Sequence, residues 1–132
     1  MEFHHAGIAT RNAGELAELY GELFGADCVH EEEFHGMYVC FLSVGDGYLE
    51  LLEPVSGEGT IAEYLDRNGP GIHHLAVETD DIEGALDAAR DLGVDLVDEQ
   101  PRPGAWGHRV AFLHPGSTGG VLFEFVEESH DA

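Results

Sequence analysis

The chain has 132 residues, enough for one domain with its own hydrophobic core. It carries 27 Asp and Glu against five Lys and Arg, all of them arginine, for a formal net charge of −22, which argues against nucleic acid or an anionic membrane as a partner. No apolar run has the length of a membrane span, the start shows no signal-peptide pattern, and two cysteines make no disulfide framework. These features predict a soluble, cytoplasmic protein.

The acidic composition also predicts that stability depends on salt. Like charges repel one another in the folded chain, and at about 1 M salt the Debye length falls to about 3 Å, so this repulsion is screened. We therefore expect a halophilic source and an unfolding free energy that rises as KCl is added. Urea denaturation at increasing KCl concentrations measures the effect, and a stability that falls with added salt would contradict it.

The predicted elements begin with a unit that occurs twice. HHAGIATRNAGELAELYGELFGADCV, from residue 4, aligns with HHLAVETDDIEGALDAARDLGVDLV, from residue 73. Both read as a His-His pair on a short strand, a polar corner, a helix, a glycine and another strand. Helical spacing of apolar residues supports both helices, with Leu16, Leu19, Tyr20, Leu23 and Phe24 in the first and Ile82, Ala85, Leu86 and Ala89 in the second. Asp80 or Asp81 is placed to cap the second helix.

Further strands follow each helix. They are predicted at residues 28–33, 37–44 and 47–53 in the first half, and at 94–98, 108–113 and 121–127 in the second. The chain is thus a single domain of two modules, about 3–54 and 71–128, joined by a connector with a short helix near 60–67. We predict an α+β fold of paired β-α-β-β-β modules, whose mixed sheet forms a cleft with the helices on its outer face.

Strand alternation assigns a face to each histidine of the two pairs. Successive strand residues point to opposite faces of a sheet. In the strand at 72–78, His73 alternates with the larger aliphatic side chains, whereas His74 shares its face with small residues. His4 and His5 divide in the same way. Because the larger aliphatic side chains should contact the helices, we expect His5 and His74 on the open face.

Two glutamates lie in apolar strands, Glu50 in YLELLEP and Glu124 in GVLFEFVEE. A carboxylate in such a place costs free energy unless it has a partner. One histidine and one glutamate from each half could together bind one ion, and this ligand set suits Co²⁺, Ni²⁺, Mn²⁺ or Zn²⁺. The alternative interpretation is that both glutamates lie on exposed strand faces of a very acidic protein.

The chain resembles the vicinal oxygen chelate superfamily, which includes glyoxalase I, and within it the methylmalonyl-CoA epimerases. The stretches that carry the resemblance are HHAGIAT, FLSVGDGYLELLEP, TIAEYLDRNGPGIHHLAVETDDIEGAL and DEQPRPGAWGHRVAFLHPGSTGGVLFEF. By position, the resemblance places the metal ligands on His5, Glu50, His74 and Glu124. It implies one divalent ion, with Co²⁺ favoured, an acyl-CoA thioester as substrate and a homodimer.

The implied reaction interconverts (R)- and (S)-methylmalonyl-CoA by removal and return of the α-proton, with Glu124 or Glu50 as the base. A metal ion would stabilise the enolate. Arg102, Arg109 and His108, around the PRPGAWGH turn, are candidates for contacts with the coenzyme A phosphates.

The sequence departs from this family at three positions. Trp106 stands where relatives often have a histidine, and Gly116 where they often have a lysine. Val39 stands where some epimerases carry a glutamate, so no second acid or base is assigned. Two alternatives remain open: a lactoylglutathione lyase with the same ligands, and a non-catalytic small-molecule-binding protein of the same fold.

Overall fold

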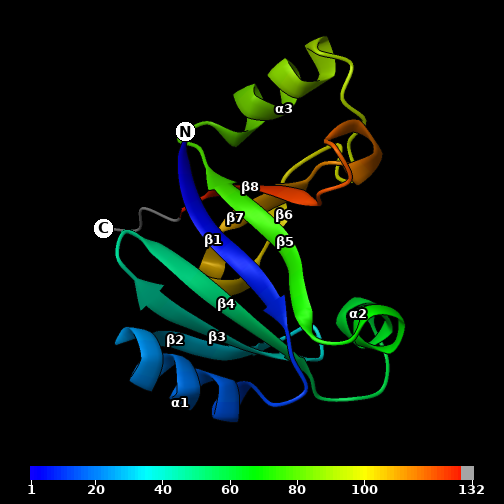
Figure 1. The fold of residues 1–132 in the computed structure, drawn as a ribbon. Coiled ribbons are helices and arrows are strands. Elements are labelled where there is room, and N and C mark those ends of the chain that lie inside the picture. Colours follow the sequence, from blue (N-terminus) through cyan, green and yellow to red (C-terminus); the bar gives the residue numbers. More distant parts are fainter. Residues whose placement is uncertain (129–132) are drawn as a thin grey trace. The chain divides into compact units, whose positions relative to one another are not determined.

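The computed structural model describes residues 1–128, which fold as two compact units. The first unit is His5–His73, and the second combines Met1–His4 with the chain from His74 onward. The element order β-α-β-β-β occurs twice, which confirms the predicted α+β class (Figure 1). No helix among the described residues is long and apolar enough to cross a lipid bilayer.

The first unit contains a four-stranded mixed sheet. Its strands are β1 (Glu2–Ala9), which enters this unit at His5, β2 (Asp27–Phe34), β3 (Met37–Val44) and β4 (Gly47–Pro54). They lie in the order β2-β3-β4-β1, with β1 parallel to β4 and the other neighbours antiparallel. The tight turn between β2 and β3 places His35 and Gly36 at positive φ, as a two-residue hairpin turn requires.

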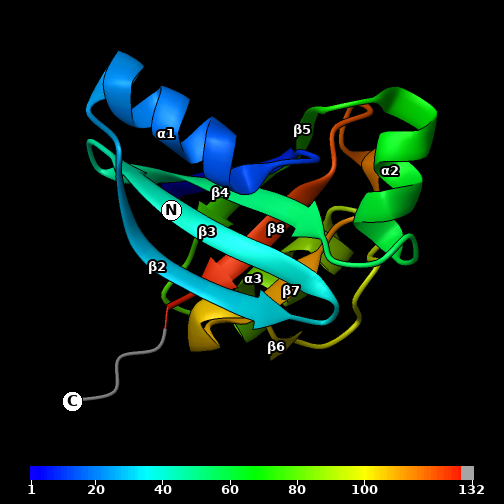
Figure 2. The same cartoon turned by 90° about the horizontal axis from the view of Figure 1, so that it is seen from below.

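Helix α1 (Ala13–Phe24) covers one face of this sheet, as Figure 2 shows. Asn12 caps its start, because the side chain of Asn12 accepts a hydrogen bond from the N–H of Glu15 (3.0 Å). Leu16 and Tyr20 pack on a core made of Ala13, Ala26, Cys40, Leu42 and Leu51. The rest of the predicted apolar stripe is exposed in this chain, namely Leu19, Leu23 and Phe24. The connector helix is α2 (Thr60–Asn68), which packs against β4.

The second unit repeats the same sheet order. Its strands are β5 (Gly71–Glu78), which enters this unit at His74, β6 (Arg102–Pro103), β7 (Arg109–Phe112) and β8 (Phe123–Glu127). They lie in the order β5-β8-β7-β6, with β5 parallel to β8 and the other pairs antiparallel. Helix α3 (Ile82–Asp91) packs its buried Ile82, Leu86 and Ala89 against Ala111 and Leu113.

Asp81 rather than Asp80 caps α3, because its side chain accepts a hydrogen bond from the N–H of Gly84 (3.0 Å). The prediction of a strand at 94–98 is wrong: the segment makes only one isolated bridge, between Leu96 and Leu113. The carboxylate of Asp98 accepts a hydrogen bond from the N–H of Phe112 (2.8 Å), so this donor is not available to a neighbouring strand. The two-residue β6 pairs with β7 instead.

Candidate active site

A histidine and a glutamate meet on the first sheet, on the face opposite α1. Parallel β1 and β4 pair Gly7 with Glu50, and Gly7 lies two residues beyond His5. Side chains two residues apart on a strand share a face, so the register brings His5 beside Glu50. The Nε2 of His5 lies 3.2 Å from Oε1 of Glu50, and the side chains of His5 and Glu50 are only 4% and 9% exposed.

The second unit contains the same arrangement. Parallel β5 and β8 pair Ala76 with Glu124, and Ala76 lies two residues beyond His74. The Nε2 of His74 lies 3.5 Å from Oε1 of Glu124, with side chains 4% and 8% exposed. Phe123 and Phe125, the neighbours of Glu124, pack in the core under α3. Each buried glutamate therefore points away from the helix of its unit, as strand alternation predicts.

Each His–Glu pair has a phenylalanine beside it that the sequence analysis did not single out. Phe41 on β3 lies opposite Glu50, and Phe112 on β7 lies opposite Glu124. Each ring meets the histidine of its unit edge-on, with ring centroids 5.7 Å and 5.4 Å apart and interplanar angles of 89° and 85°. The sequence could have indicated both phenylalanines, because a similar pattern occurs in the two halves: V-C-F-L precedes Glu50 and V-A-F-L precedes Glu124.

The donor atoms of each pair suit a divalent transition-metal ion. Imidazole nitrogen and carboxylate oxygen are ligands that such ions accept together. Both side chains of each pair are buried among apolar neighbours, where an uncompensated carboxylate is costly. A phenylalanine packs edge-on against each imidazole. Each unit can thus supply two ligands to a metal ion.

Comparison with known proteins identifies the family. The glyoxalase/bleomycin resistance protein/dioxygenase superfamily matches residues 4–112. The mitochondrial methylmalonyl-CoA epimerase of Dictyostelium discoideum is 38% identical over 131 residues, which cover 96% of this chain and 78% of the relative. The ethylmalonyl-CoA/methylmalonyl-CoA epimerase of Cereibacter sphaeroides is 34% identical over 128 residues, which cover 94% of this chain and 96% of the relative. The chain belongs to the methylmalonyl-CoA epimerase family of this superfamily.

Solved structures agree with this membership. A variant of Streptomyces coelicolor methylmalonyl-CoA epimerase, in complex with 2-nitronate-propionyl-CoA, superposes with a TM-score of 0.92 at 33% identity. The superposition covers 98% of this chain and 96% of that one. The resemblance drawn from the sequence is therefore confirmed, as is the prediction that the chain is an enzyme of the isomerase class.

The arginines predicted to bind substrate are engaged by carboxylates of their own unit. Arg109 contacts Glu83 and lies 3.0 Å from a carboxylate oxygen of Glu127. Its guanidinium lowers the pKa of Glu83, and the hydrogen bonds to both carboxylates raise the pKa of Arg109. Arg102 contacts Asp98 (3.1 Å) and lies over the ring of Phe112. A contribution of either arginine to substrate binding stays a prediction.

Other positions singled out from the sequence differ in burial. Val39, where some epimerases carry a glutamate, is fully buried in the first unit. His73 is half-buried and packs edge-on against Tyr64 of α2 (5.1 Å between ring centroids), which agrees with a position on the helix side of the sheet. His108, predicted to contact substrate, is buried beside His4.

Proposed function

We propose that the protein interconverts (R)- and (S)-methylmalonyl-CoA and binds one divalent ion through His5, Glu50, His74 and Glu124. The observation that carries the proposal is the buried His–Glu pair, which occurs once in each unit in the same strand register. The names of the family relatives support the substrate. Co²⁺ is the favoured ion, and Mn²⁺, Ni²⁺ and Zn²⁺ are alternatives because they also bind imidazole and carboxylate ligands.

The proposed chemistry moves one proton. The α-carbon of the substrate lies between a thioester and a carboxylate, so breaking its C–H bond leaves an electron pair that spreads onto the thioester oxygen. The ion, when bound, supplies Lewis-acid stabilisation for this negative charge. Glu124, or its counterpart Glu50, accepts the proton on a carboxylate oxygen. A proton from solvent is then added to the opposite face of the carbon, and the glutamate releases the proton that it accepted to solvent, so the epimerisation consumes no atoms or electrons.

Substrate charge gives the arginines their proposed role. Coenzyme A is a polyanion, and the net charge of −22 opposes its approach at low ionic strength. We propose that Arg102 and Arg109 contact its phosphates by exchanging their carboxylate partners for phosphate oxygens. A homodimer and a cytoplasmic location stay predictions.

Exchange of deuterium at the α-carbon tests this function. In D₂O with KCl, we expect the enzyme to exchange the α-proton of methylmalonyl-CoA for deuterium. A chelator should slow the exchange about 10³-fold, because a metal ion contributes several kcal/mol of charge stabilisation and each 1.4 kcal/mol is tenfold in rate. Added Co²⁺ should restore it. His74→Ala should behave like the chelated enzyme, whereas His114→Ala, at an exposed turn histidine, serves as the matched control.

Each contrary result leads to a different conclusion. Exchange that continues at full rate in chelator would reject the metal. No exchange with methylmalonyl-CoA, together with turnover of the hemithioacetal of methylglyoxal and glutathione, would identify a lactoylglutathione lyase instead. Tight binding of either compound without turnover would identify a binding protein.

A further inference from the structure

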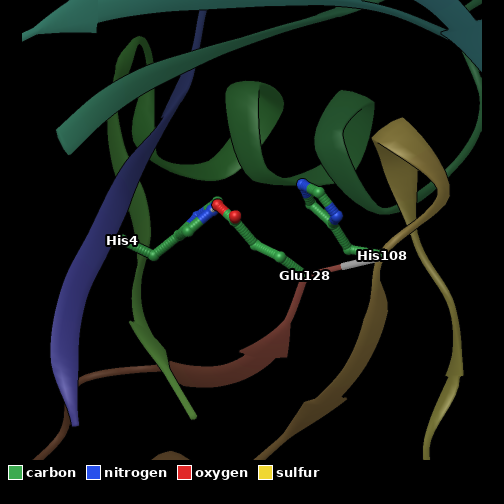
Figure 3. Close-up of side chains that lie close together, drawn as sticks. All are labelled: His4, His108 and Glu128. Atoms are coloured by element: carbon green, nitrogen blue, oxygen red, sulfur yellow. Dashed lines mark hydrogen bonds and ion pairs between the residues drawn. The ribbon is translucent and has the colours of Figure 1, made fainter. Parts of the chain in front are cut away.

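A second cluster of metal-binding residue types lies in the second unit and uses none of the four residues proposed to bind the active-site ion. Its members are His4 on β1, His108 just before β7 and Glu128 just after β8, drawn together in Figure 3. One donor atom of each side chain lies within 4.8 Å of the others. We refer to these three residues as the His4 cluster.

The His4 cluster is mostly buried and closely packed. His4 is 2% exposed and His108 is 8% exposed, whereas the side chain of Glu128 is 31% exposed. The Nε2 of His4 lies 2.9 Å from Oε1 of Glu128. The two imidazoles meet edge-on, with ring centroids 5.6 Å apart and planes at 89°. Two imidazoles and one carboxylate thus lie close together in a place that little solvent reaches.

A tight turn holds His108 in this position. The N–H of Gly104 donates a hydrogen bond to the carbonyl of His108 (2.8 Å), which closes the turn. A Cβ on Gly104 would come within 2.7 Å of a methyl group of Val110, so only glycine fits there. Trp106 adopts a left-handed φ of 65° and lies beside the ring of His108, 5.5 Å between centroids. The ring of His108 is therefore supported by the turn on one side and faces His4 on the other.

Two imidazoles and one carboxylate are the protein ligands of a common class of zinc site, in which water occupies the fourth position. Tetrahedral Zn²⁺ with bonds of about 2.0–2.2 Å places its donors about 3.3 Å apart. Nε2 of His4 and Oε1 of Glu128 are already closer than that. The remaining donor distances need to shorten by at most about 1.5 Å. Rotation of Glu128, the most exposed member, can shorten its distance to His108, and rotation of the two imidazoles must shorten the distance between His4 and His108.

We propose that His4, His108 and Glu128 bind one Zn²⁺ ion. Coordination replaces the contact between His4 and Glu128 with a bond from each to the ion. Any proton on Nε2 of His4 moves to Nδ1 of the same ring or to solvent. The bound ion connects the start of β1, the turn before β7 and the end of β8. These three segments of the second unit are far apart in the sequence, so Zn²⁺ stabilises the folded chain.

Zinc binding to the full-length chain tests the proposal. The metal-stripped protein is dialysed against Zn²⁺ in concentrated KCl, which suppresses weak binding to the acidic surface, and bound zinc is counted by elemental analysis. Wild type should bind one more zinc ion per chain than His4→Gln, His108→Gln or Glu128→Gln. Each change should weaken zinc affinity at this site at least about 100-fold, because loss of a residue that only supports a metal ligand already lowers metal affinity 10–100-fold. His30→Gln is the matched control: its Nε2 also lies 2.9 Å from a glutamate oxygen, but no third donor among the described residues completes a group there.

Thermal unfolding supplies a second readout, because an ion that binds only the native state raises the melting temperature. Zn²⁺ should raise it further in wild type and His30→Gln than in Glu128→Gln, whose changed side chain is partly exposed and should leave the fold intact. Equal zinc stoichiometry and equal melting shifts in wild type and all three cluster variants would overturn the proposal. So would a loss of the ion in His30→Gln equal to that in the cluster variants.

The same measurement on His74→Ala separates this site from the proposed active site. If His74→Ala keeps its full zinc content while Glu128→Gln loses an ion, the His4 cluster is a zinc site and His74 does not bind zinc. If only His74→Ala loses an ion, the active-site metal stands and the His4 cluster is not a zinc site.

Discussion

Replacing Glu124 by glutamine is expected to lower kcat by about 10²- to 10⁴-fold, the usual contribution of a positioned general base. Glutamine has nearly the same size and shape, so the fold should remain, but its amide cannot accept the α-proton. Turnover and α-deuterium exchange measure the loss. Metal content is measured on the same sample, because Glu124 is proposed as both base and ligand. A loss of activity with metal still bound identifies the base.

Two companion variants make this result specific. Glu33→Gln applies the same change at an exposed position of β2 and should retain wild-type turnover. Glu50→Gln removes the corresponding carboxylate of the first unit and decides which glutamate accepts the proton. Wild-type exchange in Glu124→Gln, combined with loss of exchange in Glu50→Gln, would move the base to Glu50. Full activity in both variants would contradict carboxylate catalysis.

Phe41→Ala is expected to lower the free energy of unfolding by about 3–5 kcal/mol, as deletion of a buried aromatic ring does. Phe41 is 1% exposed and meets the ring of His5 edge-on. The change therefore opens a cavity beside a proposed metal ligand as well as removing buried apolar surface. Urea denaturation in KCl measures the stability, and metal affinity measured alongside reports whether His5 is still held.

Phe24→Ala is the control for this change, since Phe24, at the end of α1, is 59% exposed. It should change the unfolding free energy by no more than about 0.5 kcal/mol. Phe41→Leu keeps most of the buried volume and should fall between wild type and Phe41→Ala. Equal stabilities of Phe41→Ala and Phe24→Ala would show that the packing around His5 contributes little to the fold.

The internal repeat explains why so much of the candidate site was predictable. Both halves use one strand register, in which the partner of the glutamate lies two residues beyond the histidine. Alternation along a single strand was enough to separate His74 from His73 and to direct Glu124 away from its phenylalanine neighbours. The repeat also contained Phe41 and Phe112, but an aromatic residue in an apolar strand is usually core. Its contact with an imidazole is visible only in the folded chain.

The strand expected at 94–98 shows how this reasoning fails. Its apolar pattern is that of a strand, but the side chain of Asp98 takes the hydrogen-bond donor that a strand beside β7 would use.

The apolar stripe of α1 shows a different limit of sequence-based prediction. Helical spacing correctly predicted the helix, but Leu23 and Phe24 are exposed, whereas Leu16 packs on the core of the first unit. Periodicity describes one element, whereas burial depends on what lies against it.

The sequence by itself determined the repeated β-α-β-β-β order, the direction of each histidine and glutamate in its strand, and the family. The element order and the side-chain directions follow from short-range rules, because strand alternation and helical spacing involve residues close together in the chain. The family follows from the resemblance of long stretches of the sequence. Only the tertiary structure decided which strands are neighbours and in what register, and hence which side chains meet. His4 and Glu128 lie 124 positions apart in the chain, yet their side chains are 2.9 Å apart. No local pattern connects them, because the contact exists only after His4 and the end of β8 have taken their places in the second unit.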